Sequence, residues 1–115
     1  MFNLPGGRFA REGQHHVPND VDALMRLPNV LVEICPIAYG FYAEYPYTEM
    51  HPTIRPLYEA YGGAKLCWGS DMPNLERFCT YLQGVDFLRR HCPFISREDM
   101  RLILGANAAR AFRVG

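Results

Sequence analysis

The sequence predicts an α/β fold built on parallel strands. Two short runs, 30–35 and 65–70, have the hydrophobic and partly β-branched composition of strands that are buried on both faces. Each run is followed by a loop and then by a segment whose apolar residues recur at helical spacing. Strands that alternate with helices indicate a parallel sheet, because a crossover helix must return the chain to the start of the next strand.

The composition excludes several classes of protein. The chain has 115 residues, of which 49% are hydrophobic, which is enough for a packed core. The formal net charge is zero, so nucleic acid is not an expected partner. No apolar run approaches the roughly 18–20 residues that cross a bilayer, and the first residues lack a signal-peptide pattern. We therefore expect a cytoplasmic protein that does not contact the membrane.

The cysteines do not form a recognisable metal or disulfide motif. None of them belongs to a Cys-x-x-Cys pair, and they fall within predicted strands or near a predicted helix. We expect reduced, buried thiols rather than a disulfide framework or a structural zinc site. These cysteines are Cys35, Cys67, Cys79 and Cys92.

The first third of the chain contains a short helix and the first strand. Residues 1–18 are rich in proline and glycine and are expected to be irregular, without a strand. Asn19 or Asp20 can cap a helix that ends before Pro28, and the strand 30–35 follows. The loop after this strand, 36–52, is unusually aromatic.

The middle of the chain contains the second strand between two helices. A helix over 53–61 should carry Pro56 in its first turn, where the missing N–H costs little, and Gly62 should end it. The strand 65–70 follows. The third helix is predicted to bury one continuous stripe, formed by Leu75, Phe78, Leu82, Val85 and Leu88.

The last third of the chain is predicted to be helical. Ser96 and Asp99 resemble a capping box at the start of a helix that carries Met100 and Ile103. Gly105 interrupts its pattern, and a last short helix should turn three side chains inward, those of Ala108, Ala111 and Phe112. Two parallel strands alone do not make a stable sheet, so we expect further strands from a partner chain or a larger domain.

Asp71 is the main candidate for chemistry. It directly follows the second strand, and ligands of parallel α/β folds bind beyond the carboxyl ends of strands. Alternation along the strand places Cys67, Gly69 and Asp71 on one face and Trp68 on the other. A carboxylate on the inner face needs a cation or hydrogen-bond donors. The alternative is a turn residue that caps the next helix, which is a frequent role of aspartate.

Three segments resemble the amidohydrolase-related family, which includes the aminocarboxymuconate-semialdehyde decarboxylase group. Family members have a Gly-Ser-Asp-x-Pro segment at the end of the eighth barrel strand, an Asn-Val-x-Val strand one unit earlier, and an Ile-Leu-Gly-x-Asn-Ala segment near the C-terminus. The matching segments are GSDMP at 69–73, NVLV at 29–32 and ILGANAARAF at 103–112. They occur in the same order and with similar spacing.

The resemblance implies an incomplete (β/α)8 TIM barrel. Residues 19–115 would supply the last two βα units, seven and eight, and the C-terminal helices of one partial domain spanning 1–115. The implied function is a metal-dependent hydrolase that uses a metal-activated water on a C–N or C–O bond, or a non-oxidative decarboxylase. Asp71 would contact a divalent metal, which is often zinc in this family, and would orient the metal-bound water or accept its proton.

The sequence departs from the family in its metal ligands. The family's His-x-His pair and its later histidines belong to barrel units that are not present, and His15-His16 does not have His-x-His spacing. A catalytic zinc usually has three protein ligands. We therefore expect a fragment that is inactive alone and that needs a missing N-terminal half or another copy of the chain.

Three further residues are candidates for contacts with a small-molecule substrate. Glu33 alternates with the hydrophobic residues of the first strand and can face the interior, Tyr39 begins the aromatic loop, and Trp68 belongs to the Asp71 motif. Ion pairing and packing against the barrel rim are the structural alternatives. His51 and His91 are expected to be structural. The competing hypotheses are a non-catalytic structural or interaction module, with exposed sheet edges and apolar patches, and a complete small binding domain.

Overall fold

The computed structural model describes residues 2–3, 17, 19–36 and 43–114 of the chain. Its strands form one parallel sheet in the order β1-β2-β3, and their bounds are Phe2–Asn3, Val32–Ile34 and Leu66–Trp68. Val32 pairs with Leu66 and Glu33 pairs with Cys67. Parallel strands joined through helices confirm the predicted α/β class. The continuation of this sheet into a barrel stays a prediction.

The prediction that residues 1–18 lack a strand is wrong. β1 lies at Phe2–Asn3 and pairs in parallel with the beginning of β2. Two residues are too few for a pattern of alternation, and the proline and glycine residues that argued against a strand come later, from Pro5 onward. The third strand that a small sheet requires is therefore within the chain.

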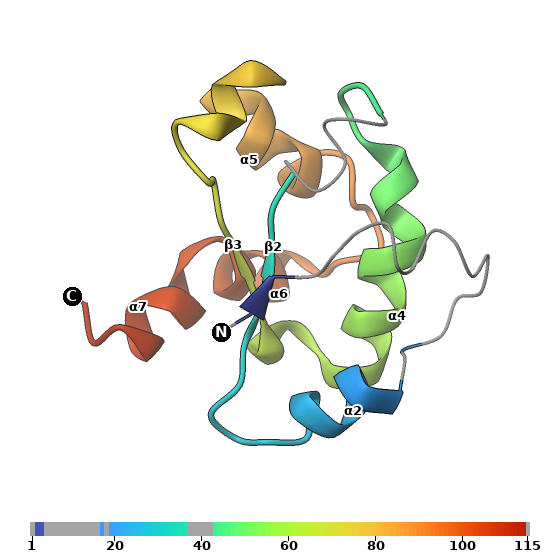
Figure 1. Cartoon of the computed structure of the whole chain (residues 1–115), viewed down its shortest axis with the longest axis vertical. Coiled ribbons are helices and arrows are strands. Elements are labelled where there is room, and N and C mark those ends of the chain that lie inside the picture. The colour runs from blue at the N-terminus through green and yellow to red at the C-terminus, as the bar shows by residue number, and fades with distance from the viewer. Residues whose placement is uncertain (1, 4–16, 18, 37–42, 115) are drawn as a thin grey trace.

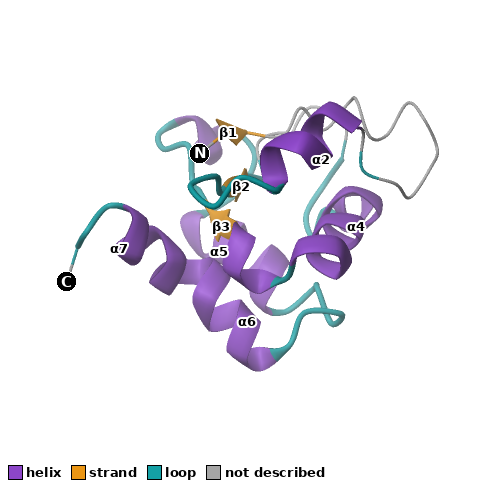
Figure 2. Ribbon diagram, turned by 90° about the horizontal axis from the view of Figure 1, so that it is seen from below, coloured by secondary structure: helices purple, strands orange, loops and turns teal. Residues whose placement is uncertain are grey.

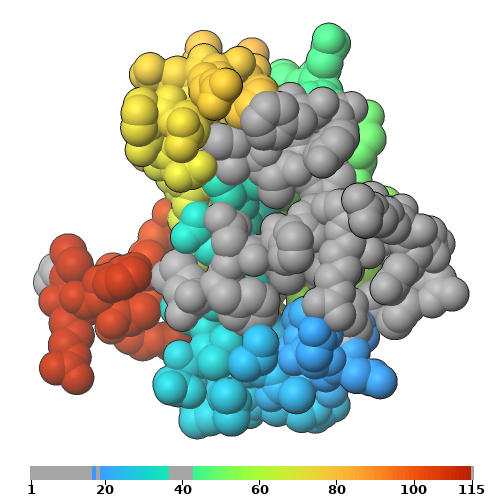
Figure 3. Space-filling model, in the orientation of Figure 1, coloured from blue at the N-terminus to red at the C-terminus, as the bar shows by residue number. Residues whose placement is uncertain are grey.

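The helices lie on both sides of the sheet. Figures 1 and 2 both show α2 and α4 on one side and α7 on the other. α2 (Asn19–Met25) lies near the amino ends of β2 and β3, and α5 (Tyr81–Arg89) near their carboxyl ends (Figure 1). Figure 3 shows α7 (Asn107–Ala111) projecting from the body of the molecule. No helix in the described part of the chain is long and apolar enough to cross a membrane.

α4 spans His51–Tyr61 and begins earlier than the sequence predicted. A 3-10 turn, η1 (Thr48–Met50), leads into it, and Pro52 occupies its first turn. Pro56 therefore lies inside the helix, which corrects the predicted position. Pro56 has no N–H to donate to the carbonyl of Pro52. Because Pro52 is exposed, water can donate to this carbonyl instead. Gly62, with a φ of 80°, ends the helix as predicted.

The predicted third helix is two separate elements. A 3-10 turn, η3, covers Asn74–Arg77, and α5 starts anew at Tyr81. Thr80 accepts from the backbone N–H of Gln83, whose side chain accepts from the backbone N–H of Thr80, which makes a complete capping box. The new start changes the helical phase, so Leu82 is 60% exposed instead of lying on the predicted buried stripe.

The C-terminal helix is continuous but changes its winding. α6 (Arg97–Arg101) passes through a π-helical turn, η4 (Leu102–Ala106), into α7. One extra residue in a turn shifts the following side chains by about 100° around the axis. Phe112 is accordingly 65% exposed and Ala111 is exposed, which corrects the predicted inward face, while Asn107 is buried.

The core lies between one face of the sheet and its helices. Val32, Ile34 and Leu66 are almost fully buried there, and Trp68 packs against the same cluster. The alternation predicted for the strands is therefore correct, with Glu33 and Cys67 on the other face. All four cysteines are buried thiols outside any disulfide, as the sequence predicted. Their thiols contribute to packing as small apolar groups.

Candidate active site

Asp71 lies in a tight turn just beyond the carboxyl end of β3. The backbone N–H of Gly69 still donates to the carbonyl of Ile34, at 3.0 Å, so pairing with β2 extends past Trp68. The Ser70 hydroxyl then accepts from the backbone N–H of Met72, at 3.3 Å. Asp71 has a φ of 53°, in the left-handed region that aspartate tolerates better than most residues, and its side chain is exposed. The turn therefore exposes the carboxylate beyond the carboxyl end of β3.

The carboxylate of Asp71 does not cap the following helix. The N-cap of η3 is Pro73, and no side chain caps it by a hydrogen bond. Asp71 contributes only its backbone carbonyl, which accepts from the N–H of Leu75 at 3.3 Å. The helix-capping alternative considered from the sequence is therefore not the role of this side chain.

The Glu33 side chain lies on the face of the sheet opposite the core and reaches across to Gly69. An added Cβ at position 69 would lie 2.1 Å from Oε1 of Glu33 and 2.3 Å from its Cδ. Position 69 must therefore lack a side chain for Glu33 to adopt this position. Glu33 comes from the middle of β2 and its carboxylate reaches Gly69, just past β3, while Asp71 follows two residues later. Two acidic residues therefore lie toward the carboxyl ends of these neighbouring strands. Both residues were candidates from the sequence.

The Cys67 thiol lies on the same face of the sheet as Glu33 and is unreactive near neutral pH. It is 1% exposed and pairs with Glu33 in the ladder. Burial, with a smaller effect of the glutamate charge, raises the pKa of the Cys67 thiol to about 11. The thiol therefore stays protonated near neutral pH and is not a nucleophile.

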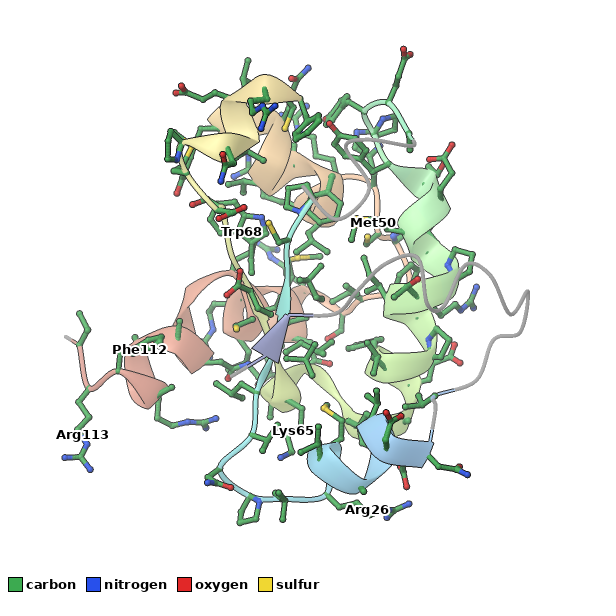
Figure 4. The ribbon with its side chains drawn as sticks, in the orientation of Figure 1. Arg26, Met50, Lys65, Trp68, Phe112 and Arg113 are labelled. Carbon is green, nitrogen blue, oxygen red and sulfur yellow. The ribbon has the colours of Figure 1, made fainter. Side chains whose placement is uncertain are left out.

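Trp68 faces the opposite side from Glu33 and contacts α5. Its indole Nε1 donates to the carbonyl of Gly84 at 2.7 Å, and its ring meets that of Tyr81 edge-on at 5.5 Å. Figure 4 shows Trp68 at the upper part of β3, far from Lys65 at the other end of the strand. The indole therefore packs on α5, on the face of the sheet opposite Glu33, and its predicted contact with substrate stays a prediction.

The described part of the aromatic loop packs against α5 and η3. Tyr47 is 1% exposed, its hydroxyl donates to the carbonyl of Phe78, at 3.4 Å, and its ring lies against Phe87. Burial is the main cause that raises the pKa of Tyr47 to about 12. Tyr45 contacts His91, with the hydroxyl 3.1 Å from Nε2. Tyr39 lies outside the described residues, so its predicted substrate contact stays a prediction.

The described residues do not by themselves form a metal site. Within them, no group of three or more histidine, cysteine, aspartate or glutamate side chains is arranged to hold a metal ion. His91 is bonded to Tyr45, and His51 packs edge-on against Phe94, at 5.3 Å. These histidines have packing roles, as expected from the sequence, while His15 and His16 lie outside the described residues.

The comparison with protein families matches residues 6–114 to the amidohydrolase family. The match covers nearly the whole chain, including β2 with Glu33 and the turn after β3 with Asp71. The chain belongs to the amidohydrolase family. At the level of the family, this amidohydrolase chain has a hydrolase-like function. The comparisons with curated proteins and with solved structures give no significant match.

Gly69 is the site residue that sequence reasoning undervalued in this amidohydrolase. The sequence only placed it on the same face as Cys67 and Asp71, whereas the structure shows the Glu33 side chain in the space that a side chain at this position would need. A glycine inside a strand often marks the close approach of another group, so a signal was present. The sequence did not show which group approaches, because strand register decides it.

Proposed function

We propose that this chain forms the Asp71 part of a metal-dependent hydrolase site, acting on a C–N or C–O bond of a small molecule. The observation that carries the proposal is the exposed Asp71 carboxylate, held by a left-handed turn just past β3 and not used as a helix cap. Membership of the amidohydrolase family supports hydrolysis as the reaction type. Non-oxidative decarboxylation is the other reaction that the sequence resemblance implies.

The chemical role proposed for Asp71 is that of a base and orienting group. An exposed carboxylate accepts a hydrogen bond from a water and can take its proton as that water attacks a carbonyl carbon. Glu33, one strand away over Gly69, would hold a polar group of the substrate. Trp68 would act indirectly, by docking the β3 end on α5.

The metal requires ligands beyond the described residues. A catalytic zinc usually has three protein ligands, and the described part of the chain offers no such group. We therefore propose that this chain is the C-terminal part of a larger (β/α)8 domain, or that it shares its site with another copy. Asp71 would be the contribution of this chain to that shared metal site.

Calorimetric titration of the purified chain with zinc and with manganese tests the proposal. The informative variant is Asp71→Asn, which keeps the size of the side chain and removes its charge. Glu76→Gln is the matched control, because Glu76 is also an exposed carboxylate close to the turn but lies in η3. We expect saturable binding that is at least about tenfold weaker in Asp71→Asn and unchanged in Glu76→Gln.

Other outcomes would count against the proposal. Equal metal affinity of Asp71→Asn and the unsubstituted chain would exclude a metal contact for Asp71. Equal weakening by both substitutions would indicate a general effect of surface charge. If the chain hydrolyses a small ester or amide only with metal present and Asp71→Asn abolishes that reaction, the base role of Asp71 is supported.

A further inference from the structure

A cavity of about 420 Å³ lies between the end of α5 and the beginning of α6. This volume is within the range of about 300–1,000 Å³ that is typical of sites for small molecules. The residues that line it belong to the segment 89–104, so it is separate from Asp71 and Glu33. The proposed hydrolase function does not use this cavity.

The polar part of the lining consists of arginines. Arg89, Arg97 and Arg101 line the cavity, and no acidic side chain does so among the described residues. Arg89 is bonded to Asp86, with its Nε 2.9 Å from Oδ1. Within the described part of the chain, neither Arg97 nor Arg101 forms an ion pair with a carboxylate. Two guanidinium groups are therefore available to an anion.

The positions of Arg97 and Arg101 on the helix make an anion favourable. They are four residues apart on α6, so they lie on the same side of the helix, and like charges at this spacing repel each other. Arg97 also lies in the first turn of the helix, where a positive charge opposes the helix dipole. Of the two acids of α6, Glu98 and Asp99, the second accepts a hydrogen bond from Tyr58 at 2.6 Å, and within the described residues neither forms an ion pair with an arginine. A bound carboxylate would relieve the repulsion between the two arginines.

The rest of the lining is apolar. Cys92, Ile95 and Met100 are 2%, 7% and 9% exposed, and Leu104 and Pro93 complete the wall. The Cys92 thiol donates to the carbonyl of Phe87, and burial raises its pKa to about 12, so it behaves as an apolar group near neutral pH. These side chains provide contacts for a hydrocarbon body and almost no hydrogen-bond partners for a polar one.

We propose that this cavity binds a carboxylic acid with an apolar body, such as a medium-chain fatty acid. The carboxylate would be held by Arg97 and Arg101, since guanidinium groups bind carboxylates through paired, charge-assisted hydrogen bonds. The hydrocarbon chain would lie on Met100, Leu104 and Ile95. A sugar phosphate or nucleotide fits less well, because its hydroxyl groups would find apolar walls.

Titration of the intact chain with octanoate, followed by methyl NMR, tests the proposal. Shifts of the Met100, Ile95 and Leu104 methyl signals locate the ligand in the cavity, and their concentration dependence gives the affinity. The variants are Arg97→Gln and Arg101→Gln, and the matched control is Arg110→Gln, an exposed arginine of α7 outside the cavity. We expect about tenfold weaker binding for each cavity variant and unchanged binding for the control.

Three comparison ligands test the role of the arginines and the role of the apolar wall separately. Octylammonium has the same hydrocarbon chain with the opposite charge, acetate has the carboxylate without the chain, and inorganic phosphate is a bare anion. Octanoate should bind at least about tenfold more tightly than each of them. Equal binding of octylammonium would overturn the role of the arginines, and equal binding of acetate or phosphate would overturn the role of the apolar wall.

The folded state of each variant is checked before its affinity is compared. Arg97 and Arg101 are exposed, so glutamine at these positions should leave the fluorescence of Trp68 and the helical circular dichroism unchanged. If either variant is folded and binds octanoate as tightly as the unsubstituted chain, that arginine does not hold the carboxylate. Octanoate binding that shifts no cavity methyl signal would place the ligand elsewhere and overturn the proposal.

Discussion

The Glu33 side chain occupies the space that a methyl group on residue 69 would need. We expect Gly69→Ala to lower the free energy of unfolding by about 1 kcal/mol, the low end of the range for overpacking, because the flexible glutamate side chain must leave its position. The same substitution in a Glu33→Ala background should cost less than half as much, since the clash is then absent. Urea unfolding of the four proteins measures the coupling energy. Additive effects would show that Glu33 does not lie over Gly69.

The side chain of Asn107 connects the C-terminal helix to the start of β3 by hydrogen bonds. Its amide group donates to the carbonyls of Gly63, at 2.7 Å, and Leu66, at 2.8 Å, while its Oδ1 is buried without a hydrogen-bond partner in the described structure. Asn107→Ala should lower the free energy of unfolding by about 2–4 kcal/mol, because two carbonyls lose their donor. Asn107→Asp should be worse at neutral pH, since a carboxylate faces both carbonyls.

The exposed Asn29 provides the control for this prediction, because it lies in the turn before β2 and Asn29→Ala should change stability by less than about 0.5 kcal/mol. Chemical denaturation at several pH values separates the two Asn107 variants. If Asn107→Asp is as stable as Asn107→Ala at neutral pH, the amide is not the group that holds the helix.

At the residue scale, chain position was predictable and side-chain partners were not. The sequence placed Asp71 after a strand. It did not reveal that the Asn107 amide donates to the carbonyls of Gly63 and Leu66, more than forty residues earlier. Such contacts depend on the π-helical turn η4, which rotates Asn107 inward, and no local pattern revealed that turn.

At the element scale, the capping box at Thr80 fixes where α5 begins. Thr80→Ala removes the acceptor for the backbone N–H of Gln83, at 3.1 Å, and should lower the free energy of unfolding by about 1 kcal/mol. Trp68 is the single tryptophan and is bonded to α5, so its fluorescence reports the docking of this helix. Urea unfolding followed by fluorescence and by circular dichroism measures the effect.

Thr48→Ala is the control for the Thr80 substitution. Thr48 is exposed and begins η1, which has no side-chain cap, so its loss should change stability by less than about 0.5 kcal/mol. Equal effects of the two substitutions would mean that the Thr80 hydroxyl contributes no capping energy.

The sequence predicted whether a segment is a helix or a strand better than it predicted where each element begins and ends. Both predicted strands and the C-terminal helical segment are present, because hydrophobic composition and Gly or Ser signals mark them. The predicted stripe from Leu75 to Leu88 failed because apolar residues kept helical spacing across a break at 78–80. Thr80 and Gln83 carried the signal for a new helix start, and a capping box outweighs an extended pattern.

At the scale of the whole molecule, β1 adds a third strand to the sheet with only two residues. The sequence indicated a piece of a larger fold because just two strands were visible, and the short N-terminal strand had no pattern to reveal it. The strands are short, so the expected long open edges are absent from the described sheet. Large apolar side chains are nevertheless exposed near α5 and α7, among them Tyr81, Leu82 and Phe112.

The buried thiols should make the whole fold less stable at alkaline pH. Burial raises the pKa of Cys67 to about 11 and that of Cys92 to about 12, from an ordinary value of 9.0, and it also raises the pKa of Cys79. Above pH 9 the unfolded chain loses thiol protons that the folded chain keeps. The contribution of these thiols to the free energy of unfolding should therefore be constant below about pH 8 and fall as pH rises from 9 toward 12.

Replacing one of these thiols should make the alkaline decline less steep. Cys92→Ala removes the thiol whose pKa is raised most, so its stability should be lower at pH 7, because a cavity forms, but should decrease less between pH 8 and 10.5. Urea unfolding under reducing conditions across this range measures both curves. Leu82→Ala is the control, since Leu82 is exposed and carries no titratable group, so its loss should leave the slope unchanged. Parallel curves for Cys92→Ala and the unsubstituted chain would mean that the Cys92 thiol ionises as readily in the folded protein as in the unfolded chain, and that the alkaline decline has another origin.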